Sequence, residues 1–308
     1  MLEETGDLEI EEFYQESLLA ATDIMPGVAQ GRADLGYMVS LYHPGELPLS
    51  QVVGIPFKTS DAEAQAKTLN ALYAENESFR AEYDQQGVHV LSFVPVASSI
   101  VGTKEPLNGL DDLKGKKIRA IGLLSQALQS AGASPVALPA PEVYESVERG
   151  IIDGFASYPL DVAVANSLHE VAPYMTDPGS GLYLAAAVIM NKDLWDGLSE
   201  AERAVVTDPI EDYVDNAVEL LAEEEQKTCD ILKESGGQAT VFSEEDVERF
   251  AELSADAAVA SWREQVAQAG VSEDVANDFF EQYEAVLAEE EASSSYTSGV
   301  AACAGAGS

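Results

Sequence analysis

The sequence predicts an α/β fold, because strand and helix patterns alternate along its central part. Between residues 113 and 159, short apolar runs alternate with helical patterns, which is typical of a parallel sheet covered by helices. A hydrophobic content of 46% in 308 residues is enough for one large core or two modest ones. Amphipathic helical patterns with serine caps follow at 244–268 and 273–290.

The central part forms a complete β-α-β-α-β run. Its predicted elements are a strand at 117–121, a helix at 124–130, a strand at 135–138, a helix at 141–150 and a strand at 151–155. Gly132 and Gly150 close the two helices, and Pro141 opens the second one because proline is favoured in a first helical turn.

Further elements flank this run. They are helices at 22–29, 61–76 and 78–86, strands at 33–38, 88–96, 182–190 and 240–242, and a helical segment from 199 to 236. Ser199 and Glu202 form a capping box at the start of that segment, and Pro209 interrupts it. Its apolar stripe does not keep strict heptads, which argues against a coiled-coil dimer.

Arg119 is the unusual residue of the central run. It lies inside a predicted parallel strand, where both faces are normally apolar, so its guanidinium needs a partner or costs several kcal/mol. The planar fork of arginine can hold a carboxylate bidentately, and we predict that Arg119 binds the carboxylate of a ligand. The alternative is a core arginine that pairs with an acidic side chain of the same chain.

The charge of the chain excludes several partners. It has 16 basic and 55 acidic residues, which gives a net charge of −39. Such a protein repels nucleic acid and anionic membrane surfaces. The diffuse acidic surface suggests a saline habitat, and a merely soluble acidic protein is the alternative.

No cofactor or metal site is predicted. His43, His89 and His169 are far apart and lack ligand spacing, and neither a Gly-rich phosphate loop nor a G-x-S-x-G elbow occurs. Cys229 lies in a helical segment and Cys303 in a tail of small residues, and these settings argue against a disulfide between them.

Three segments in order resemble the solute-binding receptors of TRAP transporters, the DctP family: DDLKGKKIRAIG, AGASPVALPAPEVYESVERGIIDG and VIMNKDLWDGLSEAERAVV. The resemblance runs from near Gly31 to about Phe280. It implies a two-lobed, periplasmic-binding-protein-like (type II) fold with hinge strands and a long lobe-spanning helix. It also implies a periplasmic or cell-surface receptor, expected to be a monomer, in which Arg119 binds a small organic acid that is handed to a membrane permease.

The resemblance also suggests a division of the chain. Lobe one is expected to comprise 1–97 with 184–225, and lobe two 98–183 with 226–288. Residues 289–308, of low complexity from Ala292 onward, are expected to be a disordered tail. The first residues have no apolar signal segment, and LEIEEFYQES at 8–17 resembles the family's second strand, so one β-α unit is expected to be missing.

Other candidate ligand contacts lie near predicted strand ends. The hydroxyls of Ser98 and Ser99 follow a strand that ends at the crossing between lobes, and Tyr37 and Tyr42 are candidate walls of the pocket. Core or rim aromatics are an equally good interpretation of the two tyrosines.

A second group of candidates comes from the resemblance to the DctP family. Ser157 and Tyr158 stand where many relatives have a Gln-Glu-Asn-Pro-like turn, and Asn191 either touches ligand or caps a helix. Two alternatives to a transport receptor remain: a free-standing sensor, and an enzyme for carboxylic acids with His169 or Asp153 as its base.

Overall fold

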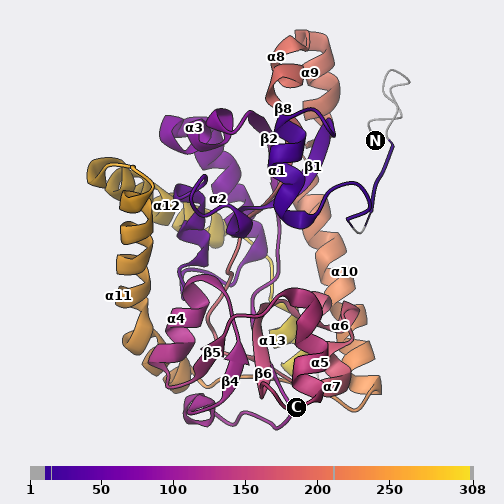
Figure 1. The fold of residues 1–308 in the computed structure, drawn as a ribbon, viewed down its shortest axis with the longest axis vertical. Helices are drawn as coiled ribbons and strands as arrows, with labels where there is room; N and C mark the ends of the chain where they lie inside the picture. Colours follow the sequence, from indigo (N-terminus) through magenta and orange to yellow (C-terminus); the bar gives the residue numbers. More distant parts are fainter. Residues whose placement is uncertain (1–10, 15, 211, 306–308) are drawn as a thin grey trace.

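Two separate sheets divide the molecule into two lobes, which lie one above the other in Figure 1. The computed structural model describes residues 11–14, 16–210 and 212–305. In this part of the chain the predicted two-lobed α/β architecture is confirmed. The predicted strand at 8–17 lies partly outside the described residues, and its described residues, 11–14, 16 and 17, form no strand.

Lobe one, the upper lobe in Figure 1, is built on a sheet with the strand order β1-β8-β2. Strands β1 (Leu35–Val39) and β2 (Val88–Val94) both pair antiparallel with β8 (Ala186–Asn191), which returns from lobe two. Strand β8 is shorter than predicted from the apolar run at 182–190, because Leu182 still belongs to the crossing and donates its backbone N–H to Thr59.

Lobe two contains a mixed sheet with the order β5-β4-β6-β3-β7-β9. Its strands are β3 (Ile100–Thr103), β4 (Lys117–Arg119), β5 (Ser134–Val136), β6 (Gly154–Tyr158), β7 (Tyr174–Asp177) and β9 (Gln238–Val241). The run β5-β4-β6 is parallel, as the alternating pattern predicts, whereas β3 is antiparallel to both of its neighbours.

Strand β6 begins three residues later than predicted. The apolar run at 151–155 predicts one strand, but Ile151 is 55% exposed and precedes the sheet. Gly154 is the first residue of the strand, and a side chain there would overlap the carbonyl oxygen of Gly102 on β3. This shift puts Ser157 and Tyr158 inside the sheet rather than in a loop after it.

Helices cover the sheets of both lobes. The α-helices are α1 (Ile24–Ala29), α2 (Ala62–Glu75), α3 (Glu77–Gln85), α4 (Gly122–Ser130), α5 (Val143–Glu148), α6 (Leu160–Ala165), α7 (Leu168–Val171), α8 (Lys192–Gly197), α9 (Glu200–Thr207), α10 (Tyr213–Glu234), α11 (Glu244–Gln268), α12 (Glu273–Ser293) and α13 (Gly299–Gly305). Short 3-10 helices are η2 (Ala21–Asp23), η3 (Ser40–Tyr42), η4 (Leu49–Gly54), η5 (Leu110–Leu113), η6 (Ala140–Glu142) and η7 (Asp208–Ile210). The capping box of Ser199 and Glu202 is present in α9.

Helices α10 and α11 run along opposite sides of the molecule and connect the lobes (Figure 1). The predicted division assigned 226–288 to lobe two, but the structure differs. The second half of α11 and all of α12 pack into the core of lobe one, where the indole of Trp262 donates to the carbonyl of Pro48 and lies against Phe280. Phe250, in the first half of α11, belongs to a core cluster of lobe two.

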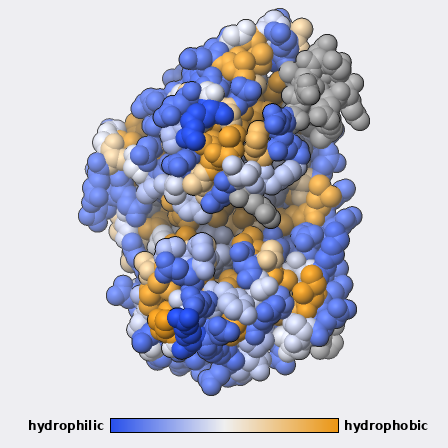
Figure 2. All heavy atoms as spheres, turned by 45° about the vertical axis from the view of Figure 1, so that its right-hand side comes forward, coloured by the Kyte–Doolittle hydropathy of each residue, from blue (hydrophilic) through white to orange (hydrophobic). Residues whose placement is uncertain are grey.

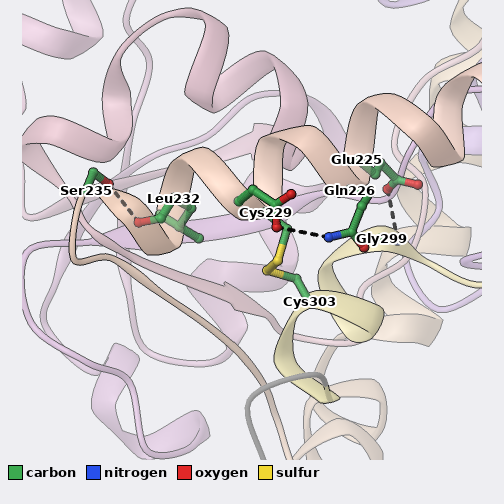
Figure 3. The surroundings of a disulfide bond; sticks show 8 residues. Glu225, Gln226, Cys229, Leu232, Ser235, Gly299 and Cys303 are labelled. Carbon is green, nitrogen blue, oxygen red and sulfur yellow. Dashed lines mark hydrogen bonds between the residues drawn. A yellow bond between two sulfur atoms is a disulfide. The ribbon is translucent and has the colours of Figure 1, made fainter.

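The C-terminal segment is folded, which corrects the expectation of a disordered tail at 289–308 for the residues described. After α12 the chain crosses back to lobe two and forms α13, which packs against β9. Figure 3 shows Cys303 of α13 joined to Cys229 of α10, so the cysteines do pair. The small residues permit close packing, since a side chain at Gly299 would overlap Glu225.

We predict that this disulfide contributes measurably to stability. The cysteines are 74 residues apart, and closing a loop of that length stabilises a protein by about 4 kcal/mol in the chain-entropy model. Cys303→Ser should therefore lower the free energy of unfolding in urea by a comparable amount. Reductant should destabilise the wild type by the same amount and should not affect a Cys229→Ser, Cys303→Ser double variant. A wild-type unfolding curve that is unchanged by reductant would contradict this prediction.

Candidate functional site

A cavity of about 830 Å³ lies between the two lobes. Lobe one contributes residues from η3 to η4. Lobe two contributes the end of β4 and the segments after β4 and β5, and α11 contributes its last turn. The lining residues are Leu41, Tyr42, Pro44, Gly45, Gln51, Gly54, Arg119, Ile121, Gly122, Leu123, Leu138, Pro139, Ala140, Gln265, Gln268 and Ala269. In Figure 2 the outer surface of both lobes is largely hydrophilic, while hydrophobic residues show between the lobes.

Arg119 is the last residue of β4 and reaches the cavity from the carboxyl edge of the lobe-two sheet. Its side chain is held by uncharged groups: Nε donates to the carbonyl of Leu138 at 3.1 Å and Nη1 to that of Ala156 at 3.3 Å. The guanidinium also lies 4.8 Å from the ring centre of Tyr158, a cation–π contact. These contacts within the protein fix the orientation of the fork.

Arg119 has no acidic partner in the part of the chain that the structure describes. Among the described residues, no Asp or Glu oxygen lies within ion-pair distance of its guanidinium, and Nη2 has no acceptor. The residue is nevertheless only 5% exposed. The alternative considered from the sequence was a core arginine that pairs with an acidic side chain of the same chain. The described part of the chain contains no such pair at Arg119.

The predicted serines are buried and bonded to the protein itself. The hydroxyl of Ser99 accepts a hydrogen bond from the backbone N–H of Ser157. The hydroxyl of Ser157 in turn accepts one from the backbone N–H of Ile121. Ser157 has a φ of 60°, in the left-handed region, so these bonds hold a strained backbone position near the end of β6. The hydroxyl of Ser98 lies 3.2 Å from that of Ser298 in the C-terminal crossing. None of Ser98, Ser99 and Ser157 lines the cavity.

The tyrosines and Asn191 occupy different places. Tyr42 lines the cavity and is 45% exposed, whereas Tyr37, on β1, does not line it. Tyr158 lies beneath Arg119, and burial raises the pKa of its phenol while the guanidinium charge partly offsets this.

Asn191 caps α8 by accepting a hydrogen bond from the backbone N–H of Leu194. Its amide donates to the carbonyls of Val28 and Ala29, so its polar atoms bond within lobe one.

Gln51 is a cavity residue that the sequence interpretation missed. It is 6% exposed, lies in η4, and donates both hydrogens of Nε2 to the carbonyls of Ser40 and Leu47, at 2.9 and 3.0 Å. The available signal was a single amide side chain within the apolar run PLSQVVGIPF. A polar side chain buried within an apolar run needs a hydrogen-bond partner, so its position in this run could have identified Gln51 as a candidate site residue.

The side chains of an enzymatic alternative lie elsewhere. Asp153 accepts from the backbone N–H of Lys117, at the opposite end of β4 from Arg119, and His169 lies in α7. Neither lines the cavity. No group of His, Cys, Asp and Glu in the described residues is arranged to hold a metal ion.

With this geometry established, comparison with known proteins gives the family. A family model described as bacterial extracellular solute-binding protein, family 7 (DctP), matches residues 1–265. The chain belongs to this family. The DctP family consists of TRAP-type periplasmic receptors, so the predicted family and the extracytoplasmic location are confirmed. No helix in the described ranges combines the length and apolar character needed to span a bilayer.

Curated relatives of this DctP-family chain have different ligands in their names. The ectoine-binding periplasmic protein TeaA of Halomonas elongata is 26% identical over 82% of the chain and 74% of the relative. The C4-dicarboxylate-binding periplasmic protein DctP of Rhodobacter capsulatus is 27% identical over 60% of the chain, which spans 55% of that protein's length.

A solved structure supports the fold. The TRAP periplasmic solute-binding protein of Desulfovibrio salexigens, an open complex, superposes with a TM-score of 0.80 at 25% identity, over 95% of this chain and 90% of that one. The two-lobed fold predicted for the DctP-family chain is thus the fold of a TRAP solute-binding protein.

The cavity wall at η4 rests on a buried carboxyl group. Glu82 on α3 accepts from the backbone N–H groups of Leu49 and Ser50 at the start of η4, and from the hydroxyl of Ser50. Burial raises the pKa of Glu82 to about 8, although these hydrogen bonds lower it in part. The same contacts fix the helix that carries Gln51.

This pKa predicts a pH dependence of stability. Because the folded pKa of Glu82 is raised from 4.5 to about 8, the folded state retains a proton that the unfolded state has lost, and stability falls as pH rises through this range. Urea unfolding between pH 5 and 8 should show a shallower fall for Glu82→Gln than for the wild type. Glu77→Gln, an exposed change in the first turn of the same helix, should keep the wild-type slope. Equal slopes for wild type and Glu82→Gln would refute the assignment.

Proposed function

We propose that this chain binds a small organic acid between its lobes through a salt bridge to Arg119 and delivers it to the membrane permease of a TRAP transporter. The observation that carries the proposal is a buried guanidinium at the cavity wall with no acidic partner among the described residues. A carboxylate would supply the missing charge and an acceptor for Nη2. The receptor is proposed to act as a monomer, without catalysis.

Binding is proposed to be coupled to closure of the lobes. A carboxylate at Arg119 would remove the free-energy cost of enclosing an unpaired cation, so the ligand itself would favour the closed form. Closure excludes water, which strengthens the charge contact because the local dielectric constant falls. The closed form would be the shape that the permease recognises.

The net charge of −39 does not prevent this binding. Repulsion between the acidic surface and an anionic ligand is screened over roughly 8 Å at physiological ionic strength. The contact at Arg119 is short-ranged and lies inside the protein, where salt screens it less. We therefore expect high salt to help the approach of the acid more than it weakens the bound state.

The proposal predicts a large loss of affinity in Arg119→Ala. Native mass spectrometry of the purified protein would identify a co-purified acid, and calorimetry with that acid would give its dissociation constant. Losing a charged hydrogen bond costs up to about 3 kcal/mol, so affinity should fall about a hundredfold or more. Arg119→Lys should recover part of it, because lysine keeps the charge but not the planar fork.

The matched control for this experiment is Arg149→Ala. Arg149 is exposed and pairs with Glu145 one turn away on the surface of lobe two, so its loss changes the net charge equally without reaching the cavity. Thermal melting would show that each variant is folded. An Arg119→Ala protein that is folded and binds the acid as tightly as wild type would disprove the proposed function.

A further inference from the structure

We infer that Gln51 accepts a hydrogen bond from a hydroxyl or N–H group of the ligand, so that the receptor selects hydroxy or amino acids over dicarboxylic acids. This inference rests on the proposed function, since it takes the carboxylate of the ligand to be held by Arg119. It adds a second contact on the opposite lobe and with it a class of ligand.

The orientation of the Gln51 amide is fixed by the protein. Nε2 has two hydrogens, and both are donated to backbone carbonyls, those of Ser40 and Leu47. A flipped amide would place Oε1 against the same two carbonyl oxygens, where no hydrogen bond can form. Nε2 therefore faces the protein, and Oε1 is the atom left for a partner.

The oxygen Oε1 has no donor among the described residues. Gln51 is buried, yet it lines the cavity, and Oε1 is not among the fully enclosed atoms without a partner. The oxygen is thus within reach of a molecule in the cavity. Because an amide oxygen accepts hydrogen bonds but never donates them, its natural partner is a hydroxyl or an N–H group.

A second carboxylate would find no counter-charge among the described residues that line this cavity. Of the described residues that line the cavity, Arg119 alone is basic, and the residues from lobe one carry no positive charge. A carboxylate facing Oε1 would bring two acceptors together and would be buried without a counter-charge. The chemistry of the site disfavours dicarboxylic acids.

Apart from Arg119 and Gln51, the described residues that line the cavity are mainly apolar, with polar side chains only at Tyr42, Gln265 and Gln268. Leu41, Ile121, Leu123, Leu138 and Pro139 line the cavity and offer no hydrogen-bonding side-chain atoms. A ligand that matches the whole site therefore has a carboxylate at one end, an apolar middle, and a hydroxyl or N–H group at the other end. Aromatic and aliphatic hydroxy or amino monocarboxylic acids are the chemical class that fits, and the hydroxy acids are used to test it.

The test compares acids that differ only in the group presented to Gln51. One set is 3-hydroxybenzoate, 3-methylbenzoate and benzene-1,3-dicarboxylate, and the other is 4-hydroxybutanoate, pentanoate and pentanedioate. In each set a hydroxyl, a methyl and a carboxylate occupy the same position. Calorimetry on the wild-type protein should show at least one hydroxy acid binding about tenfold or more tightly than its methyl analogue, with the diacid weakest.

Substitutions of Gln51 assign this preference to the residue. In Gln51→Lys the ammonium group can still donate to the carbonyls of Ser40 and Leu47 but cannot accept, so the hydroxyl preference should disappear and binding of the diacid should improve. Gln51→Met removes both properties and should bind the hydroxy and methyl acids equally. Gln129→Lys, an exposed change of the same kind near the end of α4, should leave the wild-type order intact.

The outcomes separate this inference from the proposed function. Equal binding of hydroxy and methyl acids by the wild type overturns the role of Gln51, even if the variants fail to fold. A preference that persists in a folded Gln51→Met protein does the same. In both cases a loss of binding in Arg119→Ala would keep the proposed function standing. No binding of any of the six acids would overturn the ligand class inferred from Gln51 but not the proposed function, which is tested with the co-purified acid. Binding of that acid that ignores Arg119→Ala would overturn both.

Discussion

The structure is organised around one buried cation that the described part of the chain leaves without a counter-charge. The Arg119 guanidinium is held by two backbone carbonyls and one aromatic ring, and these come from different segments: Leu138 after β5, Ala156 and Tyr158 in β6. The parallel arrangement β5-β4-β6 brings these groups to one edge of the sheet. Much of lobe two can therefore be understood as the frame that fixes a single positive charge at the boundary between lobes.

Features set by local sequence were predictable. The capping box of α9, the bounds of α11 and the parallel run around β4 follow from caps, periodicity and alternation, which act within a few residues. Arg119 stood out for the same reason, as a charge within an apolar strand. Its lack of an acidic partner was a guess from the sequence, because pairing depends on which distant carboxylates the fold brings near.

Features set by distant contacts were not predictable. The disulfide joins residues 74 apart, and the small residues around Cys303, typical of a disordered tail, instead allow α13 to pack tightly on lobe two. Likewise, the burial of Gln51 depends on Glu82, which lies more than 30 residues away and anchors η4. Ser98, Ser99 and Ser157 were predicted as ligand contacts because the sequence pattern of a hydroxyl at a strand end is the same whether the hydroxyl faces a ligand or bonds to neighbouring protein groups.

The covalent link between α10 and α13 also limits how far the lobes can separate. Helix α12 is packed into lobe one, α13 is fastened to lobe two, and only the short stretch from Ser293 to Gly299 joins them. Six Cα-to-Cα steps extend to at most about 20 Å. This stretch has a fixed maximum length, so the disulfide near the end of the chain limits the separation of two lobes whose facing walls come from much earlier segments.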